Sequence, residues 1–466
     1  MRWHLSGAIV PNNVDSAKMQ KPIEKCRTLV YYSVIREIVL TLLLTRSDFD
    51  MDKYIGVYIH IPFCKRKCAY CNFYSLGGHE ELMGDYVQAL ITHIKESESQ
   101  LSGYYIDTVF FGGGTPMCVG VDNIIRIFDA LKRCGKVLKS CEATIELNPE
   151  SVTPADLVKL KKAGFNRLSI GVQSANDDIL KTIGRRHDFG QVRRTVNSAR
   201  DAGFDNLSVD LIYGLPSQTS EDWAETISKI MILRPEHISC YGLKIEEGTP
   251  LYQMKDSPLI PDDDAQADMY LYMVDEMEKR GYKQYEISNF SKPGYESRHN
   301  LKYWQCQEYI GFGAAAHSYV GGRRYGNISD AAGYADKVMN GGSVVEQYED
   351  ISQTEQASEY VMLGLRTARG ISAEEYRRIS SYNFDRGVEL LSLYKDQGFA
   401  LENNGRWRLT PKGFLVSNVL IGQILDAQTR QRAEIATPWV QNEMPTEYYY
   451  SMLDDTSDQI QLFNGI

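Results

Sequence analysis

Hydrophobic and polar positions follow two alternating patterns along residues 54–243. Short runs of apolar and β-branched residues predict strands, and the segments between them carry apolar residues at helical spacing. The clearest helical segment is 82–94, in which apolar side chains recur at i, i+1, i+4 and i+5. The predicted strands are Tyr54–Ile61, Thr108–Phe111, Ala143–Leu147, Arg167–Val172, Leu207–Ile212 and His237–Leu243. Six strand–helix repeats predict an α/β fold in which helices cover a parallel sheet.

Several predicted strands end in turns that contain glycine or proline. These turns are Gly112–Pro116 (GGGTP), Asn148–Pro149 and Gly214–Pro216. One helix is predicted to start after Thr153 and to stop at Gly164. Because parallel α/β proteins bind their ligands at the carboxyl ends of the strands, we expect the functional site at these turns.

The alternation stops near residue 248. A helix is predicted over Asp262–Gly281, and the polar stretch Gln284–Gly326 that follows is rich in tyrosine. A second helical unit covers 352–425 and contains a predicted hairpin at Asn404–Gly405. This unit predicts a smaller C-terminal α+β domain of winged-helix-like type. Its residues 385–425 hold five Lys or Arg and four Asp or Glu, which argues against a DNA-binding wing.

The pattern divides the chain into five regions. Residues 1–50 are predicted to be an N-terminal extension outside the core, and Met51 is an alternative start of translation. The acidic tail is expected to be disordered, because its last forty residues hold six acidic and two basic side chains. The regions are 1–50, a barrel over 51–250, a connecting region over 251–350, a C-terminal domain over 351–426 and the tail over 427–466.

Composition narrows the class of protein. The 466 residues include 51 Lys and Arg against 61 Asp and Glu, a net charge of −10, which argues against a partner that is nucleic acid. The longest aliphatic stretch, Val34–Leu44, is interrupted by two charges and is too short to span a bilayer. No export signal is recognisable, so we expect a cytoplasmic protein, for which peripheral membrane contact stays open.

Three of the nine cysteines are grouped directly after the first strand. Cys64, Cys68 and Cys71 have the spacing C-x3-C-x2-C. Three thiolates can hold three irons of a cubane cluster and leave the fourth iron open to a ligand. The alternatives are inert buried thiols and a zinc site, for which Cys118 and His60 are candidate fourth ligands.

The glycine turn Gly112–Pro116 follows the second strand. Glycines at this position let a ligand approach the backbone without obstruction by Cβ and expose N–H groups. Such a turn is weak evidence alone. Its pairing with a cysteine loop on the neighbouring strand makes the combination specific.

These motifs resemble those of radical S-adenosylmethionine enzymes. Within that superfamily, the chain is similar to the HemN/HemW branch, which contains oxygen-independent coproporphyrinogen III oxidases and haem chaperones. The resemblance covers 54–425 through YIHIPFCKRKCAYCNFYS, FFGGGTP, IELNPE, RLSIGVQS, LSVDLIYGLP and GFGAAAHSY. It implies a partial (β/α)6 barrel with a C-terminal domain over its open side.

The resemblance also implies a set of site residues. Cys64, Cys68 and Cys71 would ligate a [4Fe–4S] cluster, and the amino and carboxylate groups of S-adenosylmethionine would chelate its open iron. Further cofactor contacts would be Tyr58, Gly113, Gly114, Thr115, Glu146, Gln173, Arg185 and Asp210. Two of these have structural alternatives, because Asp210 could cap a strand end and Arg185 could pair with Asp188 at the surface.

Two departures favour the chaperone side of the branch. The oxidase pattern has a further cysteine two residues after the third ligand, and Phe73 occupies that place. Residues Arg298–Trp304 (RHNLKYW) contain the HNxxYW motif of the chaperones. His299 would then be an axial ligand of haem iron. The alternative is a hydrogen-bonded histidine within aromatic packing.

The sequence thus predicts a chaperone that binds haem and a [4Fe–4S] cluster with S-adenosylmethionine, and that transfers haem to an acceptor protein. An electron donor such as flavodoxin or ferredoxin is a further expected partner, and enzymatic activity stays open. The alternative is an oxidase that decarboxylates coproporphyrinogen III to protoporphyrinogen IX by radical chemistry. A zinc-bearing binding module is a third class, which leaves the glycine turn unexplained.

Overall fold

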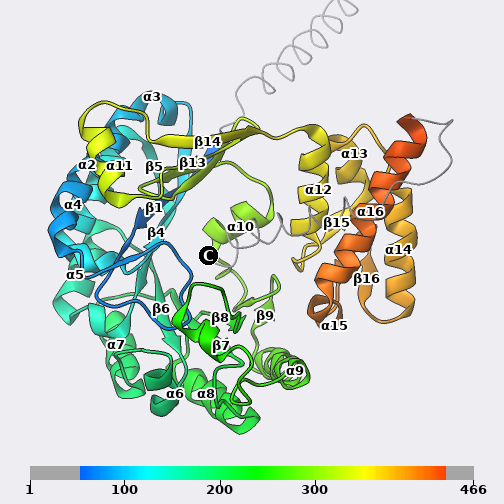
Figure 1. Ribbon diagram of the computed structural model, residues 1–466, viewed down its shortest axis with the longest axis horizontal. Helices are drawn as coiled ribbons and strands as arrows, with labels where there is room; N and C mark the ends of the chain where they lie inside the picture. The colour runs from blue at the N-terminus through cyan, green and yellow to red at the C-terminus, as the bar shows by residue number, and fades with distance from the viewer. Residues whose placement is uncertain (1–52, 437–466) are drawn as a thin grey trace, which may run out of the picture. The chain divides into compact units, whose positions relative to one another are not determined.

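Six parallel strands form the centre of the fold, as the hydrophobic pattern predicts (Figure 1). The computed structural model describes residues 53–436. The strands are β1 (Tyr54–Ile61), β4 (Tyr105–Gly113), β5 (Lys136–Leu147), β6 (Arg167–Gln173), β7 (Leu207–Tyr213) and β8 (His237–Gly242). All six predicted strands are therefore confirmed. The predicted extension 1–50, the alternative start at Met51 and the tail beyond residue 436 lie outside the described residues.

The central strands belong to a sheet that does not close on itself. Its order is β14-β13-β12-β11-β1-β4-β5-β6-β7-β8-β10-β9, and the pairs from β1 to β8 are all parallel. Strand β11 (Tyr309–Phe312) adds a further parallel strand beside β1. Antiparallel strands extend both edges. The predicted partial (β/α)6 barrel is thus confirmed, with extra strands on each side of the opening.

Helices cover the outer side of the curved sheet (Figure 1). Both predicted ends of α5 are confirmed, because Thr153 caps it by accepting from the N–H of Asp156, and Gly164 ends it with a positive φ of 105°. The helices are α2 (Met83–Glu96), α3 (Glu98–Leu101), α4 (Val121–Cys134), α5 (Pro154–Ala163), α6 (Asp177–Thr182), α7 (Phe189–Asp201), α8 (Ser220–Leu233) and α9 (Asp263–Lys279).

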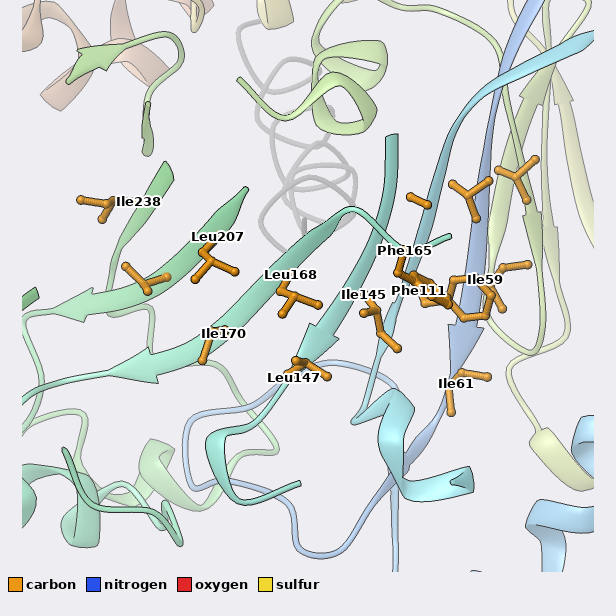
Figure 2. Close-up of a cluster of buried hydrophobic side chains, with 14 of the residues drawn as sticks. Ile59, Ile61, Phe111, Ile145, Leu147, Phe165, Leu168, Ile170, Leu207 and Ile238 are labelled. Carbon is orange, nitrogen blue, oxygen red and sulfur yellow. The ribbon is translucent and has the colours of Figure 1, made fainter. Parts of the chain in front are cut away.

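The main core lies between the sheet and these helices. Figure 2 shows strand residues that contribute to it, among them Ile59, Phe111, Ile145, Leu168, Ile170, Leu207 and Ile238. Because successive strand residues point to opposite faces, the alternate positions line the inside of the barrel. On β6, Leu168 and Ile170 are buried in the core, while Arg167 and Ser169 face inward. The inner face is therefore polar where the outer face is apolar.

The connecting region supplies short strands and two further helices besides α9. Helix α10 (Arg298–Trp304) contacts β4, and α11 (Ala331–Met339) packs on α2. The strands are β9 (Lys283–Gln284), β10 (Asn289–Ser291), β11, β12 (His317–Val320), β13 (Arg323–Asn327) and β14 (Val345–Asp350). The tyrosine-rich stretch is thus built into the edges of the sheet.

The C-terminal region forms the small α+β unit that the pattern predicts. Its hairpin turns at Asn404 and Gly405, whose φ values of 52° and 76° are those of a tight two-residue turn. The last helix continues to Ala436, so the tail predicted to start at residue 427 begins inside a helix, and that boundary is wrong. The elements are α12 (Gln353–Gly364), β15 (Ile371–Ser372), α13 (Ala373–Ile379), α14 (Asp385–Asp396), β16 (Ala400–Asn403), β17 (Arg406–Leu409), α15 (Pro411–Leu415) and α16 (Ser417–Ala436).

A helix that crosses a membrane needs about twenty mostly apolar residues. Within residues 53–436, no helix combines the length and the apolar character that crossing a membrane requires.

Candidate functional site

A cavity of about 820 Å³ lies inside the barrel. Its volume falls within the range of roughly 300–1,000 Å³ that is typical of cofactor and small-molecule sites. It is bounded by the inner faces of the strands, by the cysteine loop and by the glycine turn. The predicted site residues that line it are Tyr58, Cys64, Cys68, Cys71, Gly113, Gly114, Thr115, Glu146, Gln173, Arg185 and Asp210. His299 is the one predicted site residue that does not.

The cysteine loop lies at the carboxyl end of the barrel strands. Cys64 ends the short strand β2 (Phe63–Cys64), and the N–H of Cys71 donates to the carbonyl of Cys68 at 3.3 Å. All three thiols are free and partly buried, and burial raises the pKa of Cys71 to about 11. Metal coordination would reverse this shift, because it stabilises the thiolate. In the described part of the chain, no three His, Cys, Asp or Glu side chains are placed to hold a single metal ion.

The glycine turn packs directly against the cysteine loop. A Cβ atom on Gly114 would lie 2.7 Å from the carbonyl oxygen of Phe63 and 3.0 Å from the Cys64 sulfur. The hydroxyl of Thr115 lies 3.6 Å from the same sulfur. Only glycine fits at this position without movement of the loop. The two motifs, which the sequence places after neighbouring strands, are therefore in direct contact in the structure.

Two carboxyl groups face the cavity from neighbouring parts of the barrel. The N–H of Gly113 donates to Glu146 Oε2 at 3.3 Å, and the Ser169 hydroxyl donates to both oxygens of Asp210 at 3.2 and 3.1 Å. Burial, and then the charge of Asp210, raise the pKa of Glu146 to about 8. Burial also raises the pKa of Asp210. An ammonium or sulfonium ligand would stabilise both ionised groups.

The alternative that Asp210 caps a strand end is wrong, because it lies within β7 and faces the cavity. Arg185 also departs from its structural alternative. Its Nη1 donates to Cys68 Sγ at 3.5 Å, and its Nη2 donates to Asn148 Oδ1 at 2.7 Å and to the carbonyl of Gly171 at 2.6 Å. Asp188 instead caps helix α7. The Nε of Arg185 is buried without a partner, and an incoming anion would satisfy it.

Tyr58 is held in place by a buried histidine. His60 Nε2 lies 3.1 Å from the carbonyl oxygen of Tyr74, which can only accept, so this nitrogen carries the proton. His60 Nδ1 then accepts from the Tyr58 hydroxyl at 3.0 Å. Burial lowers the pKa of His60 to about 4, which keeps the ring neutral. Both nitrogens are engaged, so His60 does not offer a lone pair to zinc in this arrangement.

Gln173 ends β6 in a conformation that is uncommon for a residue with a side chain. Its φ is 68°, in the left-handed region, and its side chain is 9% exposed and lines the cavity. Such a backbone costs roughly 1–2 kcal/mol outside glycine. Strained residues of this kind cluster at functional sites, which agrees with the predicted cofactor contact.

His299 belongs to a helix that closes the barrel at the amino ends of its strands. It is fully buried, with Nδ1 2.9 Å from the Thr108 hydroxyl and Nε2 2.9 Å from the Tyr303 hydroxyl, and it stacks on Phe110. Burial lowers its pKa to about 3. The structure thus shows the second sequence alternative, a hydrogen-bonded histidine in aromatic packing. Ligation of haem by His299 stays a prediction, and it would require these bonds to break.

Sequence reasoning missed several residues of the cavity wall. Arg167, His237 and Tyr241 line the cavity from β6 and β8, Asn148 lines it from the end of β5, and Asn300 lines it from α10. Arg167 had a recognisable signal, because it shares the alternate, inward-facing positions of RLSIGVQ with Gln173. Asn300 lies inside HNxxYW and directly follows His299, the residue of this motif for which a haem-binding role was predicted.

Comparison with known proteins agrees with this geometry. Residues 58–230 match the Radical SAM superfamily, and residues 351–416 match the HemN C-terminal domain. The heme chaperone HemW of Bacillus subtilis is 36% identical over 377 residues, which cover 79% of this chain and 99% of that protein. The heme chaperone HemW of Escherichia coli is 32% identical over 373 residues, which cover 79% of this chain and 97% of that protein. The structure of coproporphyrinogen III oxidase (HemN) from Escherichia coli matches with a TM-score of 0.71 at 23% identity. The match covers 81% of this chain and 90% of that one.

A partial barrel with CxxxCxxC against a glycine turn defines a radical SAM protein, and the chain belongs to that superfamily. Within it, the chain belongs to the HemN/HemW branch, whose curated relatives carry the name heme chaperone HemW at 29–36% identity. The likeness to HemN, at 23% identity, shows the fold alone.

Proposed function

We propose that this protein is a haem chaperone that carries a [4Fe–4S] cluster with S-adenosylmethionine, binds haem and transfers it to an acceptor protein. The observation that carries the proposal is the single cavity that joins the cysteine loop, the glycine turn and the polar interior of the barrel. The names of the relatives support the haem-handling part. A cytoplasmic location, and an electron donor such as flavodoxin or ferredoxin, belong to the same proposal.

The donor set fits the cluster and its cofactor. Cys64, Cys68 and Cys71 would hold three irons, and Glu146 supplies a buried carboxyl group for the amino group of the cofactor. Arg185 offers a buried Nε without a partner to a carboxylate. When bound, the cluster and S-adenosylmethionine supply one-electron chemistry. The chain's own contribution is to orient these groups and to limit the access of water to the cavity.

Haem would be the cargo of the same cavity. Tyr303 and Tyr309 line it and offer aromatic edges and faces to a porphyrin. Their rings pack against each other at 4.5 Å between centroids. The HNxxYW segment supports this placement, because Asn300 and Tyr303 of that motif reach the cavity.

The alternative is oxygen-independent coproporphyrinogen III oxidase. One observation favours it, namely that the cavity of about 820 Å³ extends to the cysteine loop. Phe73 argues against it, because this residue is 41% exposed and replaces the further cysteine of the oxidase pattern. We therefore place the oxidase second.

The two functions separate in one paired experiment. The chain is reconstituted anaerobically with iron and sulfide and is titrated with haem. In parallel, it is incubated with coproporphyrinogen III, S-adenosylmethionine and a reductant. We expect saturable haem binding, transfer of the bound haem to a haem-binding apoprotein, and no protoporphyrinogen. Turnover of coproporphyrinogen would instead establish the oxidase.

Controls address the metal centre. The Cys64/Cys68/Cys71→Ala triple variant should lose the broad absorbance of thiolate-bound iron. Cys134→Ala is the matched control, because Cys134 ends α4 and does not line the cavity. Metal analysis that returns zinc without iron or sulfide would contradict both radical SAM functions.

A further inference from the structure

The inner end of the cavity holds a buried arginine. Arg167 is the first residue of β6, is 2% exposed and lines the cavity. Its Nη1 donates to Asn206 Oδ1 at 2.8 Å and to the carbonyl of Tyr295 at 3.2 Å. These bonds hold one edge of the guanidinium against the barrel wall. The remaining donors make no hydrogen bond within the described residues.

The charge of Arg167 has no partner at ion-pair distance in the part of the chain that the structure describes. Asp210 senses this charge, which lowers the pKa of that carboxyl against the larger effect of burial. The Asp210 oxygens are occupied by Ser169 and do not form an ion pair with Arg167. A buried cation without a counter-ion is unfavourable, so an anionic group in the cavity would be strongly stabilised there.

Two further polar groups of the barrel interior are also unsatisfied. Asn300 is 7% exposed, lines the cavity, and its Oδ1 makes no hydrogen bond. Its amide nitrogen also has no partner among the described residues. Thr144, the register partner of Arg167 on β5, is fully buried, and its hydroxyl is unpaired. Buried polar groups are normally paired, so the unpaired amide of Asn300 at the cavity wall indicates that a polar ligand is missing there.

This cluster lies at the far end of the barrel from the cysteine loop. Arg167 begins β6 and Gln173 ends it, so six residue steps of about 3.3 Å separate the two ends by roughly 20 Å. The carboxylate of S-adenosylmethionine is expected beside Arg185, at the cysteine end. A carboxylate bound beside Arg185 therefore does not reach Arg167, and an anion at Arg167 belongs to another group.

We propose that Arg167 and Asn300 form a carboxylate-binding subsite that holds a propionate of the haem within the cavity. The proposal rests on the proposed haem binding. The guanidinium would donate to the carboxylate from its free nitrogens, and the Asn300 amide would donate from Nδ2. His299 then acts as a positioning residue, because its bonds to Thr108 and Tyr303 hold α10 in place.

The test compares haem with its dimethyl ester, in which both propionates are esterified while the iron and the porphyrin face are unchanged. Binding is followed by quenching of protein fluorescence in the reconstituted full-length chain. We expect the wild-type chain to bind haem at least tenfold more tightly than the ester. Arg167→Met should remove this preference, and Arg167→Lys should keep part of it, because the ammonium retains the charge without the bidentate geometry.

Arg366→Met is the matched control. Arg366 is 8% exposed and donates to an asparagine oxygen and to a main-chain carbonyl, as Arg167 does, but it lies in the C-terminal region and does not line the cavity. It should keep the full preference for haem over the ester. If Arg167→Met does not fold, Asn300→Asp serves as the second variant. Its added negative charge should repel the propionate and reduce the preference at least tenfold.

Each remaining outcome has a distinct meaning. Equal affinity for haem and ester in the wild-type chain overturns the subsite and leaves haem binding intact. Loss of S-adenosylmethionine affinity in Arg167→Met, with the haem preference unchanged, assigns the carboxylate to the cofactor and also overturns the proposal. Failure of both tetrapyrroles to bind contradicts the proposed function itself.

Discussion

The Nε2 atom of His299 lies 2.9 Å from the hydroxyl of Tyr303, one helical turn further along α10. Residues four apart on a helix share a face, so the spacing of HNxxYW allows its histidine and its tyrosine to form a hydrogen bond. The face that carries His299 turns toward Thr108 on β4, and Asn300 turns into the cavity. The motif therefore joins two tasks, closure of the barrel and contact with its contents.

The first prediction separates these tasks at His299. His299→Ala removes two buried hydrogen bonds and a stacked ring, so we expect a loss of roughly 2–4 kcal/mol in the free energy of unfolding. Thr108→Val removes only the Nδ1 partner and should cost roughly 1–3 kcal/mol. Denaturant unfolding of both apo variants measures these losses.

The Soret band of bound haem distinguishes the two roles, because a purely structural role of His299 leaves the band unchanged. If His299 only positions α10, neither variant shifts the Soret band of the haem that remains bound. A band shift in His299→Ala that is absent from Thr108→Val would show instead that His299 ligates the iron. Unchanged stability of both variants would contradict the packing that the structure shows.

A second prediction concerns the contact between the glycine turn and the cysteine loop. Gly114→Ala places a methyl group within 3.0 Å of Cys64 Sγ and of the Phe63 carbonyl, so the loop must move. We expect S-adenosylmethionine affinity to fall at least tenfold and iron incorporation to decrease. Gly84→Ala is the matched control, because a Cβ there meets no atom within 4 Å and the residue lies in helix α2. It should keep full binding and gain up to about 1 kcal/mol of stability.

Much of this geometry follows from the sequence, and the reasons are specific. The strands β1 and β6–β8 were predicted within a residue or two, because their buried runs end at turn residues. Strands β4 and β5 begin earlier than predicted, at Tyr105 and Lys136, because polar residues, Asp107 in β4 and Lys139, Ser140 and Glu142 in β5, interrupt their apolar runs. The pairs β9–β10 and β12–β13 are short, and tertiary pairing rather than local pattern defines them.

The residues of the candidate site also fall into a group that the sequence predicts and a group that it does not. The cysteine loop and the glycine turn are local motifs, and neighbouring strands bring them together, so their contact was predictable. The orientation of α10 was not, because a seven-residue helix can present either face until it docks on β4. His299 was therefore expected to bind a ligand, and Asn300 was overlooked. Arg167 was missed because its inward position matters only once the sheet curves around a cavity.

A third prediction is a pH dependence that arises from buried neutral histidines. Burial lowers the pKa of His93 to about 4, from 6.5 in the unfolded chain. Between these values the unfolded chain binds more protons, so stability is complete above pH 6.5 and falls as the pH is lowered toward 4. The slope from one histidine reaches about 1.4 kcal/mol per pH unit.

His93→Gln isolates this contribution. His93 Nδ1 pairs with the Tyr334 hydroxyl at 2.8 Å, and neither residue lines the cavity, so we expect the substitution to leave the candidate site in place. Unfolding of the apo chain at pH 7, 6 and 5 should show a shallower slope in the variant. Identical slopes in both proteins would mean that His93 is already protonated, or exposed, in the folded state.

The fourth prediction is that the buried carboxylate of Glu146 destabilises the apo protein, because no cationic ligand offsets its charge. Its pKa is raised to about 8, so the folded chain binds more protons than the unfolded chain between pH 4.5 and 8. Stability is therefore lost as the pH rises through this window. Glu146→Gln removes the ionisation and should be more stable than the wild-type chain by roughly 4 kcal/mol at pH 8, and by less than about 1 kcal/mol at pH 5. Thermal unfolding of the apo proteins at the two pH values measures this.

The same substitution should weaken S-adenosylmethionine binding at least tenfold, because a neutral amide loses the charge attraction to the cofactor's amino and sulfonium groups. A gain in stability together with a loss of affinity is the behaviour expected of a residue that serves binding rather than folding. Asp264→Asn, an exposed carboxylate in the first turn of α9, is the control and should change neither quantity appreciably. A stability loss in Glu146→Gln would show instead that its bond to the Gly113 N–H holds the glycine turn together.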